Sequence, residues 1–143
     1  NIEALFELLL SLMPRGPRYY TVDQVSDLNM RFVASEVIRE KIMMATDEEI
    51  PYSVAVEIES YKERSEDLHY ISAIIYVERD TQKGIVIGKN GAMIKQIGGA
   101  AREELEALLS VRVFLELHVK VLKNWREDEA LLRRLGYRLP KEE

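Results

Sequence analysis

The sequence contains no cysteine and only two histidines among its 143 residues. The absence of cysteine excludes a disulfide framework and a thiolate metal site, and no HExxH pattern provides a zinc site. No apolar run approaches the ~20 residues that a membrane-spanning helix needs, and the densest one covers only residues 8–13. The N-terminus lacks the basic region and cleavage site of a signal peptide. These absences point to a cytoplasmic protein.

Positive charge is in deficit overall, because 20 lysines and arginines stand against 25 acids. A net charge of −5 argues against a general coat protein for nucleic acid, since such binding needs positive surface. The distribution along the chain is uneven, however. Residues 57–67 carry five acids and two bases, whereas residues 80–102 carry four bases and one acid. The local positive charge therefore centres on the segment GIVIGKNGAMIK, residues 84–95.

Hydrophobic periodicity predicts a small number of elements. Helical spacing predicts helices over residues 2–12, 27–45, 92–109 and 125–135, the last capped by Asn124. Alternation predicts strands over residues 52–61, 70–79 and 111–121, with an acidic loop over residues 62–67. The second strand is apolar on both faces, because Ile74 and Tyr76 lie opposite its main apolar row. We expect an α+β domain with a three-stranded sheet and helices packed on one face.

The glycine segment has three interpretations. A P-loop needs GxxxxGK followed by Ser or Thr, but the spacing from Gly84 to Gly88-Lys89 is one residue short and Asn90 replaces the hydroxyl. A Walker-B aspartate is also missing after the apolar strands. A purely structural turn between two packed helices is the second interpretation, since glycine often serves positions with positive φ.

The third interpretation is the GxxG clamp of a KH domain. In such a clamp a nucleic-acid backbone approaches main-chain N–H groups at a helix N-terminus, and bases rest on an apolar groove. The segment meets the further conditions of this interpretation. It has a basic residue in the loop, Lys89, it has no acid there, and apolar residues flank it: Val86, Ile87, Ile94 and Ile97. Ile74 and Tyr76 are further candidates for the groove, or else they pack under the long helix.

The segment VIGKNGAMIKQI resembles a KH core, and the predicted element order is similar to the type II form. The flanks EEIPYSVAVEIE, ISAIIYVERDTQKGIVIGKNG and VFLELHVKVLKNWRED resemble the C-terminal domain of the Era family of ribosome-assembly GTPases. The resemblance runs from about residue 20 to residue 137. It implies a type II KH domain over residues 20–122, with flanking N- and C-terminal helices.

What the resemblance implies for function is binding of single-stranded RNA near the 3′ end of small-subunit ribosomal RNA, during assembly of the small subunit. By position, the clamp residues of the family match Ile87, Gly88, Lys89, Asn90, Gly91 and Ile94. Lys83 and Lys95 are added on charge alone. Whether the domain also contacts a membrane peripherally stays open.

The resemblance also predicts the arrangement of the rest of the chain. Residues 1–19 are expected to be the last helix of an upstream GTP-binding domain plus a linker, and residues 123–143 a helical extension. No GTPase motif is present, so this fragment is not expected to be an enzyme, and no cofactor or metal is expected. Two alternatives remain: a KH-shaped protein-interaction module without RNA binding, and an enzyme domain that uses the glycine loop for phosphate.

Overall fold

The computed structural model describes residues 2–14, 30–46 and 50–137. Its elements follow in the order α1 (Ile2–Leu12), α2 (Met30–Ala45), α3 (Ile50–Ser53), β1 (Ala55–Ser65), β2 (Leu68–Val77), α4 (Asp80–Ile87), a 3₁₀ turn (Lys89–Gly91), α5 (Ala92–Leu109), β3 (Arg112–Val121) and α6 (Glu129–Arg134). Among these residues no helix has both the length and the apolar character needed to cross a membrane.

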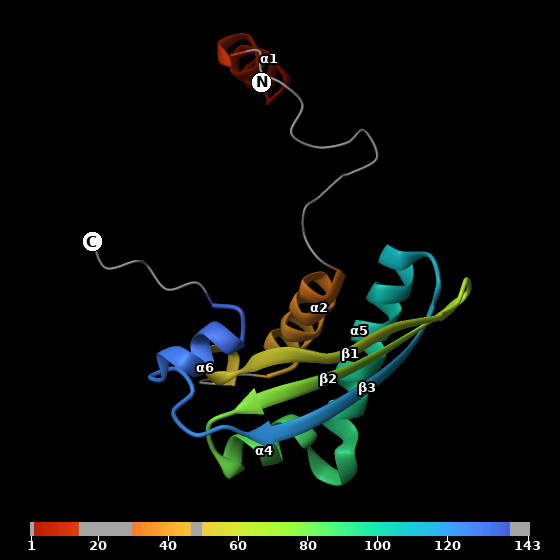
Figure 1. Cartoon of the computed structure of the whole chain (residues 1–143), viewed down its shortest axis with the longest axis vertical. Coiled ribbons are helices and arrows are strands. Elements are labelled where there is room, and N and C mark those ends of the chain that lie inside the picture. Colours follow the sequence, from red (N-terminus) through yellow and green to blue (C-terminus); the bar gives the residue numbers. More distant parts are fainter. Residues whose placement is uncertain (1, 15–29, 47–49, 138–143) are drawn as a thin grey trace.

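The three strands form one mixed sheet in the order β1-β2-β3 (Figure 1). β1 and β2 are antiparallel neighbours, whereas β2 and β3 run parallel, so the chain crosses over through α4 and α5 between them. A parallel pair requires such a crossover because its two strands start at the same end of the sheet. β2 lies in the centre, which explains why its sequence is apolar on both faces.

The main core lies between the sheet and helices α2, α4 and α5. It joins one face of β2, where Ile71, Ala73, Ile75 and Val77 are each fully buried, to the apolar stripes of the helices. The helices supply mainly Ala34, Val37, Ile38, Ile42, Val86, Ile97, Ala101 and Leu105. A bridge between Lys41 of α2 and Glu104 of α5 links two of these helices. The expected α+β fold with helices on one face of a three-stranded sheet is confirmed.

The opposite face of the sheet, called the outer face below, is covered in part. Trp125 is 3% exposed and packs with Ala55, Ile74 and Tyr76, and leucines of α6 extend this second cluster. The indole N–H of Trp125 donates a hydrogen bond to the Ser53 carbonyl at 3.3 Å. Trp125 thus anchors the C-terminal segment to the sheet.

Several predicted boundaries were wrong. β1 continues to Ser65, so most of the expected acidic loop is strand, and the turn that joins β1 to β2 is only two residues long. Tyr52 and Ser53 belong to the short helix α3, in which Pro51 is tolerated because a first-turn N–H has no helical partner. The last helix begins four residues later than expected, at Glu129. Its N-cap is Asp128, whose carboxylate accepts from two backbone N–H groups, and not Asn124.

Two expectations concern residues outside the described ranges. The predicted start of the second helix at residue 27 and the boundary near residue 20 both lie within residues 15–29, which the structure does not describe. Helix α1 is described, and none of its residues is buried.

Candidate nucleic-acid interface

The segment Gly88–Gly91 forms a tight turn between α4 and α5. Gly88 ends α4, its N–H bonds to the Gly84 carbonyl at 2.9 Å, and its backbone has φ 72° and ψ 173°. A Cβ at this position would lie 2.6 Å from the Cβ of Met93 and 2.8 Å from its backbone nitrogen. Both the left-handed φ and this close approach exclude any side chain, so the first glycine of the motif is required by the geometry of the turn.

The two residues before α5 are also left-handed. Asn90 has φ 53° and ψ 27°, which asparagine tolerates better than most residues, and Gly91 has φ 76° and ψ 16°. Gly91 is the N-cap of α5 and makes no side-chain capping bond. The N-terminus of this 18-residue helix thus has no side-chain cap. Such an end carries partial positive charge and unsatisfied N–H groups, which suits an anion.

Electrostatics reinforce this preference. Lys89 and Asn90 are exposed at the tip of the turn, Lys95 is exposed one turn into α5, and Lys83 is half-buried on α4. Residues 81–102 contain no acid, so no carboxylate on α5's first turns or on the turn itself opposes these lysines. Lys89 and Lys95 therefore lie at the turn and in the first turns of α5, and Lys83 lies on α4, five residues before Gly88.

The apolar candidates divide into two groups. Ile87 and Ile94 are half-buried next to the turn and pack against the core from its edge. Val86 and Ile97 are 0% and 1% exposed, so the expectation that they line a base groove is wrong. Both side chains face the sheet, because that is where their helices bury apolar area.

Neither expectation for Ile74 and Tyr76 was right. They lie on the outer face of β2, packed against Trp125, and so contact neither the long helix nor the glycine turn. The Tyr76 hydroxyl donates to Glu57 at 2.9 Å, and Arg134 donates to both the hydroxyl oxygen and Glu57 at 3.1 Å. Burial, followed by the bond to Glu57, raises the pKa of Tyr76.

Sequence reasoning missed one neighbour of the turn. β3 is an edge strand that contacts both α4 and α5, and its Leu115 and Leu117 are half-buried. A Cβ on Gly98 of α5 would lie 3.4 Å from a methyl of Leu117, so this glycine keeps α5 close to the strand. A Cβ added to Gly99 would meet no atom within 4 Å, so no such close approach exists there. The alternation of β3 was visible in the sequence, but its place at the sheet edge was not.

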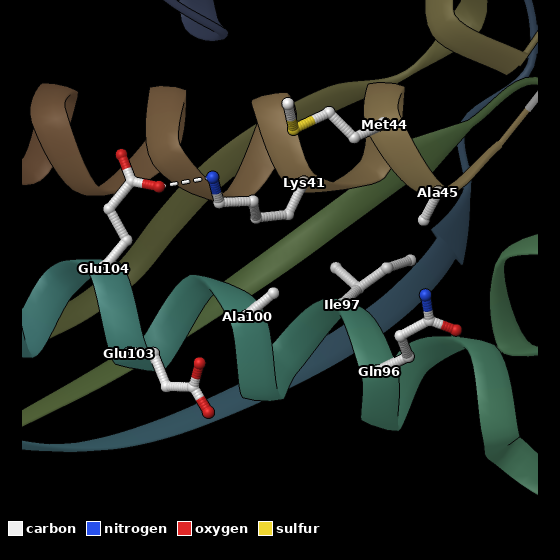
Figure 2. A pocket seen from close by; sticks show the side chains of 8 residues that line it. All are labelled: Lys41, Met44, Ala45, Gln96, Ile97, Ala100, Glu103 and Glu104. Carbon is white, nitrogen blue, oxygen red and sulfur yellow. Dashed lines mark ion pairs between the residues drawn. The ribbon is translucent and has the colours of Figure 1, made fainter.

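A separate pocket lies between α2 and α5, with Met44 and Lys41 on one side and Gln96 and Glu103 on the other (Figure 2). Figure 2 shows Lys41 turned toward Glu104, with which it forms an ion pair. Two carboxylates in the lining and a neutralised lysine make this pocket unsuitable for phosphate. Among the described residues, no group of three or more His, Asp or Glu side chains is arranged to hold a metal ion.

A mixed three-stranded sheet, helices on one of its faces and a GxxG turn between two helices together define a KH domain of type II. The model of the KH domain family (KH_2) matches residues 49–126, and the chain belongs to that family.

Within this family the relatives share one name, GTPase Era. GTPase Era of Geobacter metallireducens is 53% identical over 138 residues, which are 96% of this chain and 46% of that protein. GTPase Era of Thermotoga petrophila is 53% identical, with 94% of this chain and 46% of that protein covered. The chain thus spans about half the length of the curated relatives it matches.

Solved structures of Era also match this chain. A crystal structure of Aquifex aeolicus Era bound to GDP and aluminium fluoride matches 97% of this chain, with 40% identity and a TM-score of 0.91, and 47% of that protein is covered. A structure of Era in complex with MgGDPNP and nucleotides 1506–1542 of 16S ribosomal RNA matches equally well. The chain is similar to the KH-containing half of these proteins.

Proposed function

We propose that this chain is the RNA-binding part of an Era-type ribosome-assembly GTPase, and that it binds single-stranded RNA near the 3′ end of small-subunit ribosomal RNA. The observation that carries the proposal is the uncapped N-terminus of α5 behind the turn Gly88–Gly91, surrounded by lysines and free of acids. Era in complex with a 16S ribosomal RNA fragment supports the choice of RNA.

Each predicted site residue has a role in this proposal. Gly88 and Gly91 let the sugar–phosphate backbone approach the N–H groups of the turn, and Lys89 and Asn90 contact phosphate. Lys83 and Lys95 add positive charge on either side. Ile87 and Ile94 offer half-exposed apolar surface for unpaired bases, in the way that KH domains hold about four nucleotides.

The proposal also assigns the remaining segments. Helix α1 exposes all of its large apolar side chains, among them Ile2, Phe6 and Leu9 at 85%, 59% and 51%. Such a helix is unstable alone in water, so we assign residues 1–19 to an upstream GTP-binding domain and linker. Residues 20–122 are the KH domain and residues 123–143 its C-terminal extension. The working compartment is the cytoplasm, where ribosomal subunits mature.

The two alternatives fit the site less well. An enzyme that binds nucleotide through a P-loop needs a Ser or Thr hydroxyl and a separate aspartate to hold magnesium. The turn has Asn90 at the position of the hydroxyl. By this argument the 143-residue chain neither binds nor hydrolyses GTP, which calorimetry with GTP tests directly. A protein-interaction module has no need of an acid-free turn with three lysines around an open helix end.

Charge reversal in the turn tests the proposal. Lys89→Asp, alone and with Asn90→Asp, places negative charge where phosphate would bind, and we expect loss of binding to a short single-stranded RNA in a fluorescence titration. Both side chains are exposed, so the free energy of unfolding should change by less than about 1 kcal/mol.

The matched control for Lys89→Asp is Arg133→Asp, which makes the same charge change at an exposed site on α6. It should leave the affinity nearly unchanged. If the turn variants bind RNA as well as the parent chain while remaining folded, the nucleic-acid site lies elsewhere.

A further inference from the structure

The outer face of the sheet is covered at only one end. Trp125 and the leucines of α6 cover the side where β2 ends, over Ile74 and Tyr76. At the end where β2 begins, Phe114 of the edge strand β3 is 51% exposed although it is paired in the sheet with Tyr70 of β2. An aromatic ring left in solvent on a sheet face, next to a covered half of the same face, is a candidate contact surface.

Phe114 belongs to an ordered stack. Its ring is stacked against that of Tyr70 on β2, with centroids 6.0 Å apart and planes 18° from parallel. The guanidinium of Arg64 lies over the Tyr70 ring at 4.3 Å from its centroid. The Tyr70 hydroxyl donates to Glu116 at 2.6 Å, and this bond is the largest cause of the raised pKa of Tyr70. Neighbours on two strands thus hold the rings in place before any ligand binds.

Three cations flank this stack, although acids lie close by: Glu59 accepts from Ser72 on the same face, and Glu66 and Asp67 form the adjoining β1–β2 turn. Lys62 pairs with Tyr70 in the strand register, and Arg112 lies two residues before Phe114, so both strand positions fall on the outer face. Lys62, Arg64 and Arg112 are exposed, and none forms an ion pair with any described residue. The one carboxylate within the stack, that of Glu116, accepts from Tyr70. The group is called the outer patch, and it consists of Lys62, Arg64, Tyr70, Arg112, Phe114 and Glu116.

The distance between the outer patch and the glycine turn determines how long an RNA strand must be to contact both. α5 begins at the turn and ends at Leu109, three residues before Arg112. At 1.5 Å per residue its 18 residues span about 27 Å. The outer patch therefore lies near the far end of α5, beyond the reach of the about four nucleotides that a KH clamp holds. A longer strand is needed to contact both places.

We propose that the outer patch is a second contact for single-stranded RNA, which stacks a base on the exposed ring of Phe114 and places its phosphates beside Lys62, Arg64 and Arg112. Exposed aromatic side chains flanked by cations bind single strands in this way, because every base offers a stacking face and every linkage a negative charge. The proposal rests on the proposed function, which it extends from the strand held in the turn to a strand that continues past the end of α5.

The test compares two lengths of RNA on the 143-residue chain, about 4 nucleotides and about 16 nucleotides. We expect the parent chain to bind the longer strand more tightly, and Phe114→Ala to weaken that binding at least about fivefold. The same variant should bind the short strand as the parent does. Phe114→Leu, which keeps apolar area but has no ring, should also lose affinity for the long strand, and Phe114→Tyr should retain it.

The charge contribution is measured separately by Arg64→Glu, with Arg133→Glu as a control of identical charge change on α6. Arg64→Glu should weaken binding of the long strand and lower the slope of log affinity against log salt by about 0.7 or more. Arg133→Glu should change neither quantity. Thermal unfolding of each variant verifies that the sheet is intact.

The outcomes separate this inference from the proposed function. Failure of the parent to bind the short strand refutes the site in the glycine turn. Equal affinity of the parent, Phe114→Ala and Phe114→Leu for the long strand overturns the outer patch as an RNA contact. Competition of an acidic peptide with the long strand, dependent on Phe114 and as effective as RNA, would overturn it in favour of a protein partner.

Discussion

The two faces of the central strand β2 are built on different principles. Toward α2, α4 and α5, Ile71, Ala73, Ile75 and Val77 are packed without a polar partner in a single apolar cluster. On the outer face, tyrosines, Ser72 and Ile74 are held by hydrogen bonds to acids and by the C-terminal segment. The first face provides most of the stability because it removes the larger apolar area from water. The outer face combines a smaller apolar cluster with hydrogen bonds to acids, and its end where β2 begins is not covered.

The largest effect is expected on the helix-covered face. Ile75→Ala removes three carbons from a residue that is 0% exposed, and the core around it cannot collapse fully. We expect the free energy of unfolding to fall by about 4 kcal/mol, measured by urea denaturation. A loss below about 1 kcal/mol would show that this face is less tightly packed than the structure indicates.

Trp125→Ala is the corresponding change on the outer face. It empties the smaller cluster and removes the bond to the Ser53 carbonyl, so we expect a loss of about 3 kcal/mol. Because the sheet keeps its main core, the C-terminal segment should open first. Hydrogen exchange should therefore accelerate in residues 122–137 more than in β2, and uniform acceleration would contradict the division between the two faces.

Gly88→Ala tests whether the turn at the edge of the main core has room for a side chain. The backbone dihedral angles and the approach of Met93 lead us to expect a loss of about 2 kcal/mol. Gly84→Ala is the control: it lies within α4 with no atom within 4 Å of the added Cβ, and it should stabilise the chain by about 0.5 to 1 kcal/mol. Similar shifts in the thermal midpoints of the two variants would refute the distinction.

Tyr76→Phe should have the smallest effect. It keeps the ring in the outer cluster and removes only the hydroxyl that bonds to Glu57 and Arg134. A net hydrogen bond contributes about 1 kcal/mol, so we expect a loss of that size in urea denaturation. The double variant Tyr76→Phe with Arg134→Ala should lose less than the sum of the single changes, because the two side chains share Glu57.

Sequence patterns predicted the type of every long element but not all boundaries. The charged residues 62–64 suggested a loop, yet Lys62, Glu63 and Ser65 pair with β2 through a register that shifts twice, between Ile58 and Ser60 and between Glu63 and Ser65. Exposed strand positions accept charged residues, so polarity alone did not mark the strand's end. The late start of α6 has a similar cause, because Trp125 is held by the sheet in a turn before the helix begins.

The sequence by itself determined what is local. The turn Gly88–Gly91 uses left-handed backbone that glycine and asparagine adopt readily, and residues 81–102 carry four bases and no acid. Tertiary structure decided what depends on distant partners. It buried Val86 and Ile97 in the core, placed Trp125 over Ile74 and Tyr76, and left Phe114 in solvent. Alternation shows that a strand has two faces, but only the packing of helices and the C-terminal segment determines which parts of each face are covered.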